Sequence, residues 1–177
     1  MASERTRQRD ADFSEFVSAQ LPTLRRTAYL LCGDSHRADD LVQEAVTKLY
    51  VRWHRLGDIE RLDRYLRTML VREFLNERRL SWAKVLLFGK PVYEPEARAD
   101  DTEQRLAVRA ALARVPARQR AVLVLRFLCD LPVDEVALLL GCTAGTVKSQ
   151  TSHGLATLRG HLGDRVDLIP VLAESRS

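Results

Sequence analysis

The clearest structural signal in this chain lies near its C-terminal end, in residues Val115–Leu162, VPARQRAVLVLRFLCDLPVDEVALLLGCTAGTVKSQTSHGLATLRGHL. Two amphipathic segments with helical periodicity are separated by a short break of small residues, and polar residues line the outer side of the second segment. This layout is typical of a helix-turn-helix, whose second helix lies in the major groove of DNA. The sequence therefore predicts a DNA-reading module at this end.

The turn itself carries suitable residues. Gly141 can adopt the left-handed conformation after the first helix, and Thr143 can cap the second. The side chains expected to face DNA are Thr146, Lys148, Ser149, Ser152 and His153, and Arg118 and Arg120 are expected to give basic support. The alternative interpretation is that these polar residues form only a solvated helix face and that the arginines only solubilise a surface.

Outward from this module, helical periodicity continues through most of the chain. We predict helices near 13–32, 36–53, 62–80, 103–114, 117–129, 133–140 and 144–162, with a break or kink after Gln20 caused by Pro22. No strand alternation is present, so the predicted fold class is all-α, with two small helical domains. Their predicted bounds are 10–82 and 103–165, joined by a linker over 83–102 and followed by a tail over 166–177.

Two details of this division stay open. The segment AKVLLFG either continues the preceding helix or packs loosely against the first domain. The linker is rich in acids, which suits either a solvated spacer or a path through a basic channel.

Composition excludes several classes of protein. The chain has 177 residues, 46% of them hydrophobic, and a formal net charge of +4, which suits helical domains that contact DNA without tight nonspecific binding. Cys32, Cys129 and Cys142 lack metal-ligand spacing and are expected to be buried thiols in a reducing cytoplasm. No signal peptide, membrane span, nucleophile elbow or phosphate loop is found. We therefore expect a cytoplasmic protein that is not an enzyme, with no cofactor, metal, small-molecule substrate or membrane insertion.

Two motif blocks resemble a known family. ALARVPARQRAVLVLRFLCDLPVDEVALLLGCTAGTVKS is similar to region 4 of the extracytoplasmic-function (group IV) sigma factors of RNA polymerase. CGDSHRADDLVQEAVTKLYVRW resembles region 2, with DLVQEA intact from Asp40 to Ala45, and YLRTMLVREFLNERR occupies the place of the helix that engages the downstream promoter element. The resemblance covers roughly Phe13 to Leu162, with both blocks in the expected order.

This resemblance implies a role for each block. Asp40, Gln43 and Glu44 would contact the clamp helices of core RNA polymerase, although Asp40 and Glu44 could serve only helix capping and the helix dipole. The −35 promoter element would be read by the C-terminal module. The melted −10 element would be held by Arg64, Tyr65, Arg67, Arg72, Arg78 and Arg79. Basic residues with interleaved aromatics suit single-stranded DNA, yet Tyr65, Met69 and Phe74 at helical spacing are more often core residues.

The implied partners are core RNA polymerase and promoter DNA, with an anti-sigma protein as a further partner that the family makes plausible. The chain departs from the family pattern at His153, where arginine is common, at Val71-Arg72, where asparagine is frequent, and in an N-terminal helix that we expect to be shortened. The competing interpretation is a helix-turn-helix regulator of the response-regulator output type, which would act without being a polymerase subunit. The DDLVQEA block argues against it.

Overall fold

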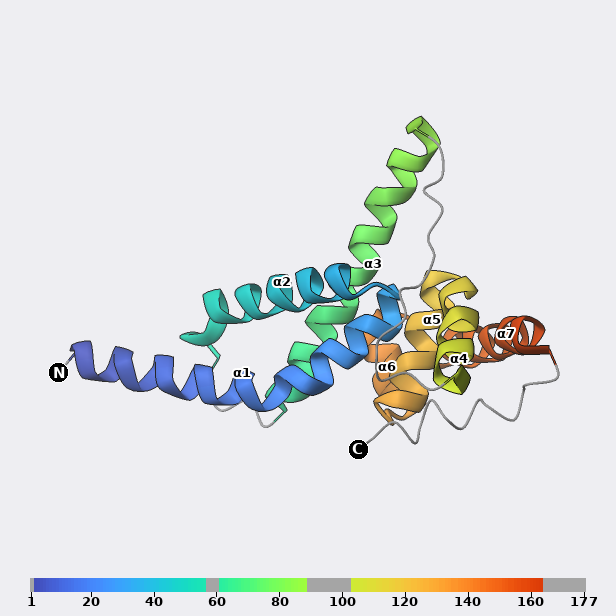
Figure 1. The fold of residues 1–177 in the computed structure, drawn as a ribbon. Helices are drawn as coiled ribbons and strands as arrows, with labels where there is room; N and C mark the ends of the chain where they lie inside the picture. Colours follow the sequence, from blue (N-terminus) through green and yellow to red (C-terminus); the bar gives the residue numbers. More distant parts are fainter. Residues whose placement is uncertain (1, 57–60, 89–102, 164–177) are drawn as a thin grey trace.

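The computed structural model describes residues 2–56, 61–88 and 103–163, and every regular element in these ranges is a helix. The expected all-α fold is confirmed. Figure 1 shows two groups of helices side by side. The first group contains α1 (Ala2–Cys32), α2 (Ser35–Trp53) and α3 (Leu62–Phe88), and the second contains α4 (Glu103–Arg114), α5 (Ala117–Leu123), α6 (Val133–Leu140) and α7 (Ala144–Leu162).

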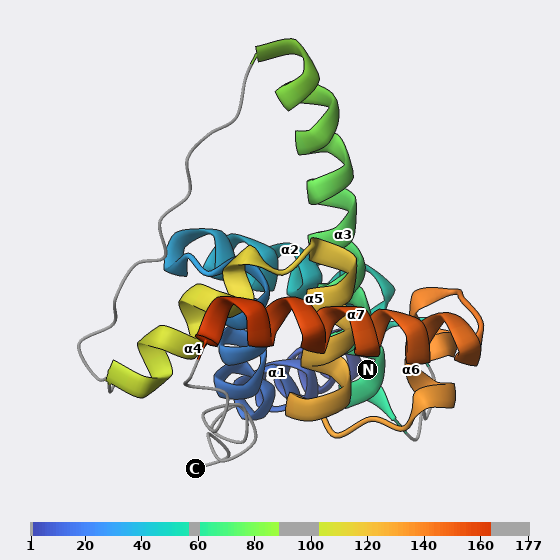
Figure 2. The ribbon, with the colours of Figure 1, turned by 90° about the vertical axis from the view of Figure 1, so that its right-hand side faces the viewer.

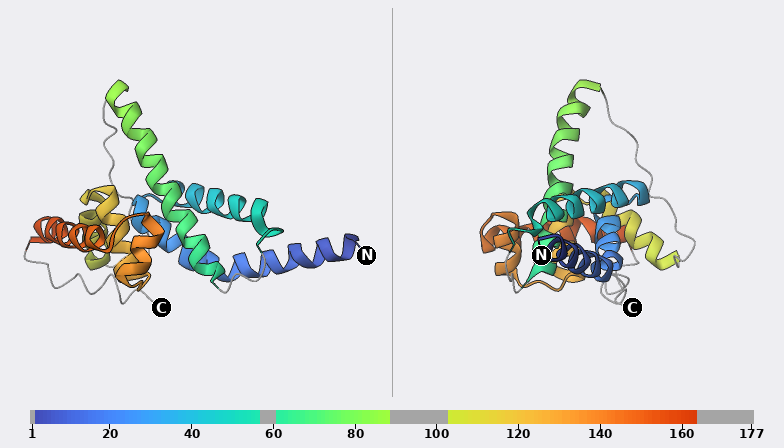
Figure 3. Two further views of the ribbon diagram at one scale, coloured as in Figure 1. Left: turned by 180° about the vertical axis from the view of Figure 1, so that it is seen from behind. Right: turned by 90° about the vertical axis from the view of Figure 1, so that its left-hand side faces the viewer.

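The first group is built on α1 and α2, which run antiparallel and are crossed by α3 (Figure 1 and the left panel of Figure 3). Leu31, Leu49, Leu66, Leu70 and Phe74 fill the space between them and are completely buried. Burial of each such side chain contributes about 1.5–3 kcal/mol. Phe74 is thus a core residue, as the helical spacing favoured.

Helix α1 differs from the sequence prediction at its start, and at Pro22 it decides between the two predicted alternatives. It begins at Ala2 and so is not shortened, and it continues through Pro22 without a break. The ring of Pro22 removes one backbone hydrogen bond, which helices tolerate as a bend. The helix changes direction about half-way along its length (Figure 1), so the kink is the alternative that the structure supports. It ends at Cys32, followed by Gly33 with φ 77°, and Asp34 caps α2 by accepting from the amide of Arg37 at 2.8 Å.

Helix α3 is longer than the pattern of apolar residues predicted. It extends to Phe88, so residues 83–88 of the segment AKVLLFG continue the helix rather than packing loosely. Its C-terminal part projects away from the rest of the molecule (Figures 1 and 2). Residues 83–88 of the predicted linker are therefore helical, whereas 89–102 and the tail 166–177 lie outside the described residues.

The second group follows the predicted helices closely, with one exception after α5. We expected one helix over 117–129, but the α-helix gives way at Val124 to a π-helical turn, η1 (Val124–Leu128). The amide of Cys129 closes this turn by donating to the Val124 carbonyl at 3.0 Å. Asp130 then takes a left-handed backbone with φ 52°, which ends the helix before α6.

The turn between α6 and α7 forms as its residues predicted. Gly141 is left-handed, with φ 61° and ψ 44°, and the Cys142 amide donates to the Ala137 carbonyl at 3.0 Å. The hydroxyl of Thr143 accepts from the amide of Thr146 at 3.1 Å and caps α7. Local side-chain chemistry therefore fixes the helix-turn-helix geometry.

Candidate nucleic-acid interface

The outer face of α7 carries the predicted DNA-facing residues. Lys148, Ser149, Ser152 and His153 are all exposed, whereas Thr146 is half-buried and its hydroxyl lies 2.9 Å from that of Thr143. The opposite face packs inward through Val147, Leu158 and Leu162, which are buried. The helix thus presents a continuous polar surface of short or cationic side chains that can reach base edges and phosphates.

Gly154 sets how closely this helix approaches α5. A Cβ atom at Gly154 would lie 3.2 Å from two side-chain carbons of Leu123 and 3.3 Å from the Cβ of Gln119. These separations are tighter than ordinary van der Waals contact. Gly154 therefore allows the close crossing that holds the outer face of α7 in place.

The two arginines predicted as basic support have different environments. Arg118 is exposed on α5, where it can contact a phosphate. Arg120 is only 3% exposed, and its guanidinium donates to the carbonyls of Leu31 at 2.6 Å, Ala113 at 2.8 Å and Val115 at 3.1 Å. The expectation that Arg120 faces DNA is corrected here, because a buried guanidinium with its donors on backbone carbonyls is structural.

The basic face of α3 is partly engaged by other protein groups. Arg72 is exposed, whereas Arg64 and Arg67 are half-buried. Arg64 lies 2.5 Å from a carboxylate oxygen of Glu135, and Arg67 pairs with Asp63 one turn before it. The half-buried Tyr65 accepts a hydrogen bond from Arg52 at 2.9 Å. Arg78 and Arg79 lie on the backbone of α3, but their side chains are outside the described residues.

A third polar surface lies on α2. Asp40, Gln43 and Glu44 are all exposed on one side of this helix, and its other side is buried through Leu41, Ala45 and Leu49. Glu44 pairs with Lys48 at 3.0 Å, and Lys48 also pairs with Glu73 of α3 at 2.7 Å. Hydrogen bonds to Glu73 and then to Glu44 raise the pKa of Lys48 above its ordinary value. The surface is thus a mixed-charge face on a rigid, well-packed helix.

The described residues were also searched for a metal site, disulfides and a membrane-spanning helix. No group of three or more histidine, cysteine, aspartate or glutamate residues is placed to hold a metal ion there. Of the three cysteines, Cys32 is buried and Cys129 and Cys142 are half-buried, and all three are free thiols. No described helix combines the length and apolarity needed to cross a membrane.

Comparisons with known proteins match both groups of helices. The Sigma-70 region 2 model matches residues 16–83, and the Sigma-70, region 4 model matches residues 105–158. The RNA polymerase sigma-E factor of Streptomyces avermitilis is 35% identical over 159 residues, covering 87% of this chain and 87% of the relative. The ECF RNA polymerase sigma factor SigM of Mycobacterium tuberculosis is 31% identical over 152 residues, covering 82% of this chain and 76% of the relative.

This chain belongs to the ECF-type RNA polymerase sigma factors. A solved structure, the sigma factor RpoE of Bartonella quintana in complex with the anti-sigma factor NepR, superposes with a TM-score of 0.70 at 26% identity, covering 85% of this chain and 96% of that one. The sigma factor described here therefore directs promoter-specific transcription initiation and is not an enzyme. Its partners are core RNA polymerase and promoter DNA.

The region 2 match falls within α1–α3, and the region 4 match falls within α4–α7 with η1. The family resemblance of the two motif blocks is confirmed, and the region 2 match in this chain argues against the competing regulator interpretation. The sequence did not reveal the partner of Arg64. Glu135 lies in the first turn of α6, and no local signal in the sequence identifies a partner so distant along the chain.

Proposed function

We propose that this sigma factor divides promoter recognition among three surfaces. Asp40, Gln43 and Glu44 on α2 bind core polymerase. The basic face of α3, with Arg64, Tyr65, Arg67, Arg72, Arg78 and Arg79, holds the melted −10 element. The outer face of α7, with Thr146, Lys148, Ser149, Ser152 and His153, reads the −35 element with phosphate contacts from Arg118. The main support for this assignment is that α2 and α7 each expose a polar face and bury an apolar face, and that each helix lies in a region matched by a sigma-factor family model.

The energetics of promoter opening support a role within a larger enzyme. Opening about ten base pairs costs about 1.4 kcal/mol per stacking step, whereas each base stacked on an aromatic side chain returns about 1–3 kcal/mol. Of the aromatic side chains of α3 that the structure describes, Tyr65 is half-buried and Phe74 is completely buried, so neither is fully free to stack. The binding energy of core polymerase must therefore supply the remainder.

We place this activity in the cytoplasm, where core polymerase acts, and we also propose an anti-sigma protein as a regulator. The second proposal is supported by the likeness to RpoE, which was solved with the anti-sigma factor NepR. The domain bounds that we propose are 10–82 for region 2 and 103–165 for region 4.

The test of this division is holoenzyme assembly and run-off transcription with purified core polymerase. The double variant Gln43→Ala with Glu44→Lys should impair core binding while retaining the helical circular dichroism of the wild type, because both side chains are exposed. His153→Ala is the matched control: it should bind core normally and alter −35 selectivity. Unchanged assembly by the double variant would show that this face of α2 is not the docking surface.

A further inference from the structure

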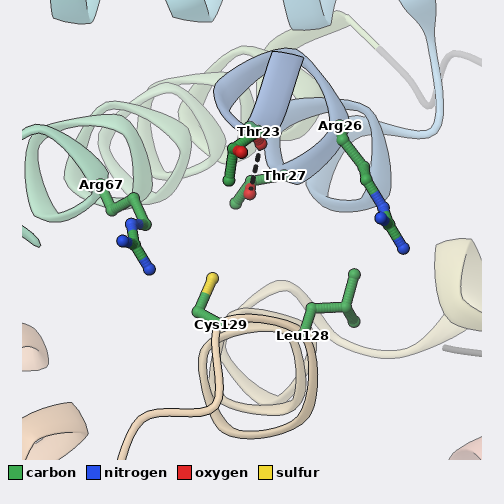
Figure 4. Close-up of a pocket in the computed structure, with 6 residues that line it drawn as sticks. All are labelled: Thr23, Arg26, Thr27, Arg67, Leu128 and Cys129. Atoms are coloured by element: carbon green, nitrogen blue, oxygen red, sulfur yellow. Dashed lines mark hydrogen bonds between the residues drawn. The ribbon is translucent and has the colours of Figure 1, made fainter. Parts of the chain in front are cut away.

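A cavity of about 230 Å³ lies where α1, α3 and the end of η1 meet (Figure 4). In this view the guanidiniums of Arg67 and Arg26 lie on either side of the cavity, with two threonines above it and a thiol and an aliphatic side chain below. The lining residues include two cations and no acid: Thr23, Arg26, Thr27, Arg67, Leu128 and Cys129. The lining is therefore positively charged.

One donor of Arg67 is buried at this cavity without an acceptor. Arg67 pairs with Asp63 through its Nη2 atom. Its Nε atom is buried and has no hydrogen-bond partner among the residues that the structure describes. Nearly all buried polar atoms in proteins are hydrogen-bonded, and an exception calls for a physical explanation such as an ion or an ordered water. This donor belongs to one of the two cations that face the cavity.

The two threonines differ in what they can offer a ligand. Thr27 is buried, and its hydroxyl donates to the carbonyl of Thr23 at 2.8 Å, so its proton is already engaged. Thr23 is exposed, and its hydroxyl can rotate to donate into the cavity. Thr23 therefore adds a neutral donor to the two guanidiniums.

The thiol of Cys129 reports on the charge inside the cavity. Cys129 directly follows η1, and its amide closes that turn by donating to the Val124 carbonyl. Burial raises the pKa of the thiol, whereas the positive charges of Arg67 and Arg26 lower it. Both cations therefore act on the same group of the lining, although they come from different helices.

The size of the cavity favours a small ion over a nucleotide. A water molecule takes up about 30 Å³ in the liquid, so the volume corresponds to roughly seven waters. Pockets for drug-sized ligands are larger, at about 300–1,000 Å³. A single tetrahedral phosphoryl group with a few waters fits this space.

We propose that this cavity binds a small phosphoryl anion, of which inorganic phosphate is the simplest, with Arg26 and Arg67 as its charged ligands and Thr23 as a neutral donor. Arginine suits this role because its planar guanidinium donates to two oxygens of one anion. A lining with two cations and no carboxylate selects an anion over a metal cation. The inference goes beyond the function proposed above and does not rest on it.

Two sources carry the same chemistry, namely a free phosphate and a phosphodiester of DNA. The lining comes from three elements, and Thr23 is the only one of its residues that is exposed. A free anion enters such a space past Thr23, whereas a DNA strand would have to pass between packed helices. The free anion is therefore the source that the cavity favours.

Isothermal titration calorimetry of the full-length protein with inorganic phosphate tests the site. The ionic strength is kept constant with chloride, because exposed charges respond to salt alone. The wild type should bind one phosphate per chain, and Arg26→Gln should weaken this binding about tenfold by removing one charged ligand. Sulfate, which has the same shape, should compete with phosphate, whereas acetate should not.

The matched control is Arg25→Gln, which removes the same charge one residue away. Arg25 is exposed, pairs with Asp39 at 3.1 Å and does not line the cavity, so this variant should bind phosphate as the wild type does. Absence of saturable binding up to about 10 mM phosphate would overturn the proposal. Equal weakening by the two variants would also overturn it, because the ion would then be held by general surface charge.

Alkylation of Cys129 locates the anion in the unaltered protein. Saturating phosphate should slow the reaction of Cys129 with iodoacetamide about threefold or more, because the anion fills the space that the thiol lines. Cys142 is half-buried and does not line the cavity, so its rate in the same peptide mass spectra should not change. An unchanged rate at Cys129 would place the bound phosphate elsewhere and overturn the site.

A single-stranded −10 oligonucleotide distinguishes the two sources. Calorimetry with this oligonucleotide should give the same affinity for Arg26→Gln and for Arg25→Gln, because the cavity takes the free anion and not the strand. If Arg26→Gln alone weakens binding of the oligonucleotide and free phosphate does not bind, the cavity takes a phosphate of DNA and the proposal is overturned. If phosphate binds as expected but the protein directs no run-off transcription with core polymerase, the proposed function fails and the anion site stands.

Discussion

Replacing Arg120 by methionine should lower the free energy of unfolding of this sigma factor by about 3–5 kcal/mol, because it leaves three backbone carbonyls without their donor and each unsatisfied buried acceptor costs about 1–3 kcal/mol. Methionine keeps much of the aliphatic stem but leaves the carbonyls of Leu31, Ala113 and Val115 without the donors they now have. For a chain of this size, 1 kcal/mol corresponds to about 2–4 °C in the melting temperature. The expected fall is therefore roughly 6–20 °C.

The assay is urea unfolding of the full-length protein followed by circular dichroism, with thermal melting as a second readout. Arg118→Met is the matched control, because Arg118 lies on the same helix but is exposed, and it should change stability by less than about 0.5 kcal/mol. Arg120→Lys should fall between the two, since an ammonium cannot reproduce the planar fork of the guanidinium. A stability of Arg120→Met within 1 kcal/mol of the wild type would refute the conclusion that this arginine is structural.

Two further perturbations follow from packing and burial. Gly154→Leu should destabilise the protein by about 1–3 kcal/mol in urea unfolding, because the new side chain would overlap Leu123. The control Gly160→Leu has nothing near its Cβ position and should be neutral or slightly stabilising. Equal effects of the two substitutions would contradict the close crossing of α5 and α7. Burial raises the pKa of Cys129 above the ordinary thiol value. The difference in pKa between the folded and unfolded states stabilises the folded protein while the thiol is neutral, below the ordinary thiol pKa. This stabilisation is lost as the pH rises through the higher pKa of the folded state. The stability advantage of the wild type over Cys129→Ser should accordingly shrink above about pH 8.5, and an advantage that grows with pH would contradict this burial.

Much of the local structure could be predicted because its signals are local. Asp34, Gly141 and Thr143 set helix ends through hydrogen bonds and backbone conformations that involve only nearby residues. Apolar spacing likewise placed Phe74 in the core. The same reasoning was less successful at Pro22 and after α5. A break and a kink have the same sequence signal at Pro22, and the π-helical turn adds no distinctive residue to the pattern.

The all-α class, the helix-turn-helix and the two motif blocks of a sigma factor could be predicted from the sequence alone, because helical periodicity, capping and motif spacing depend on residues close together along the chain. The roles of the arginines, in contrast, depend on tertiary packing. Arg118 and Arg120 are two residues apart, yet one is exposed and the other reaches Leu31 of the other region. Arg64 pairs with Glu135 for the same reason, because contacts between residues distant in the sequence set the surroundings of each charged side chain.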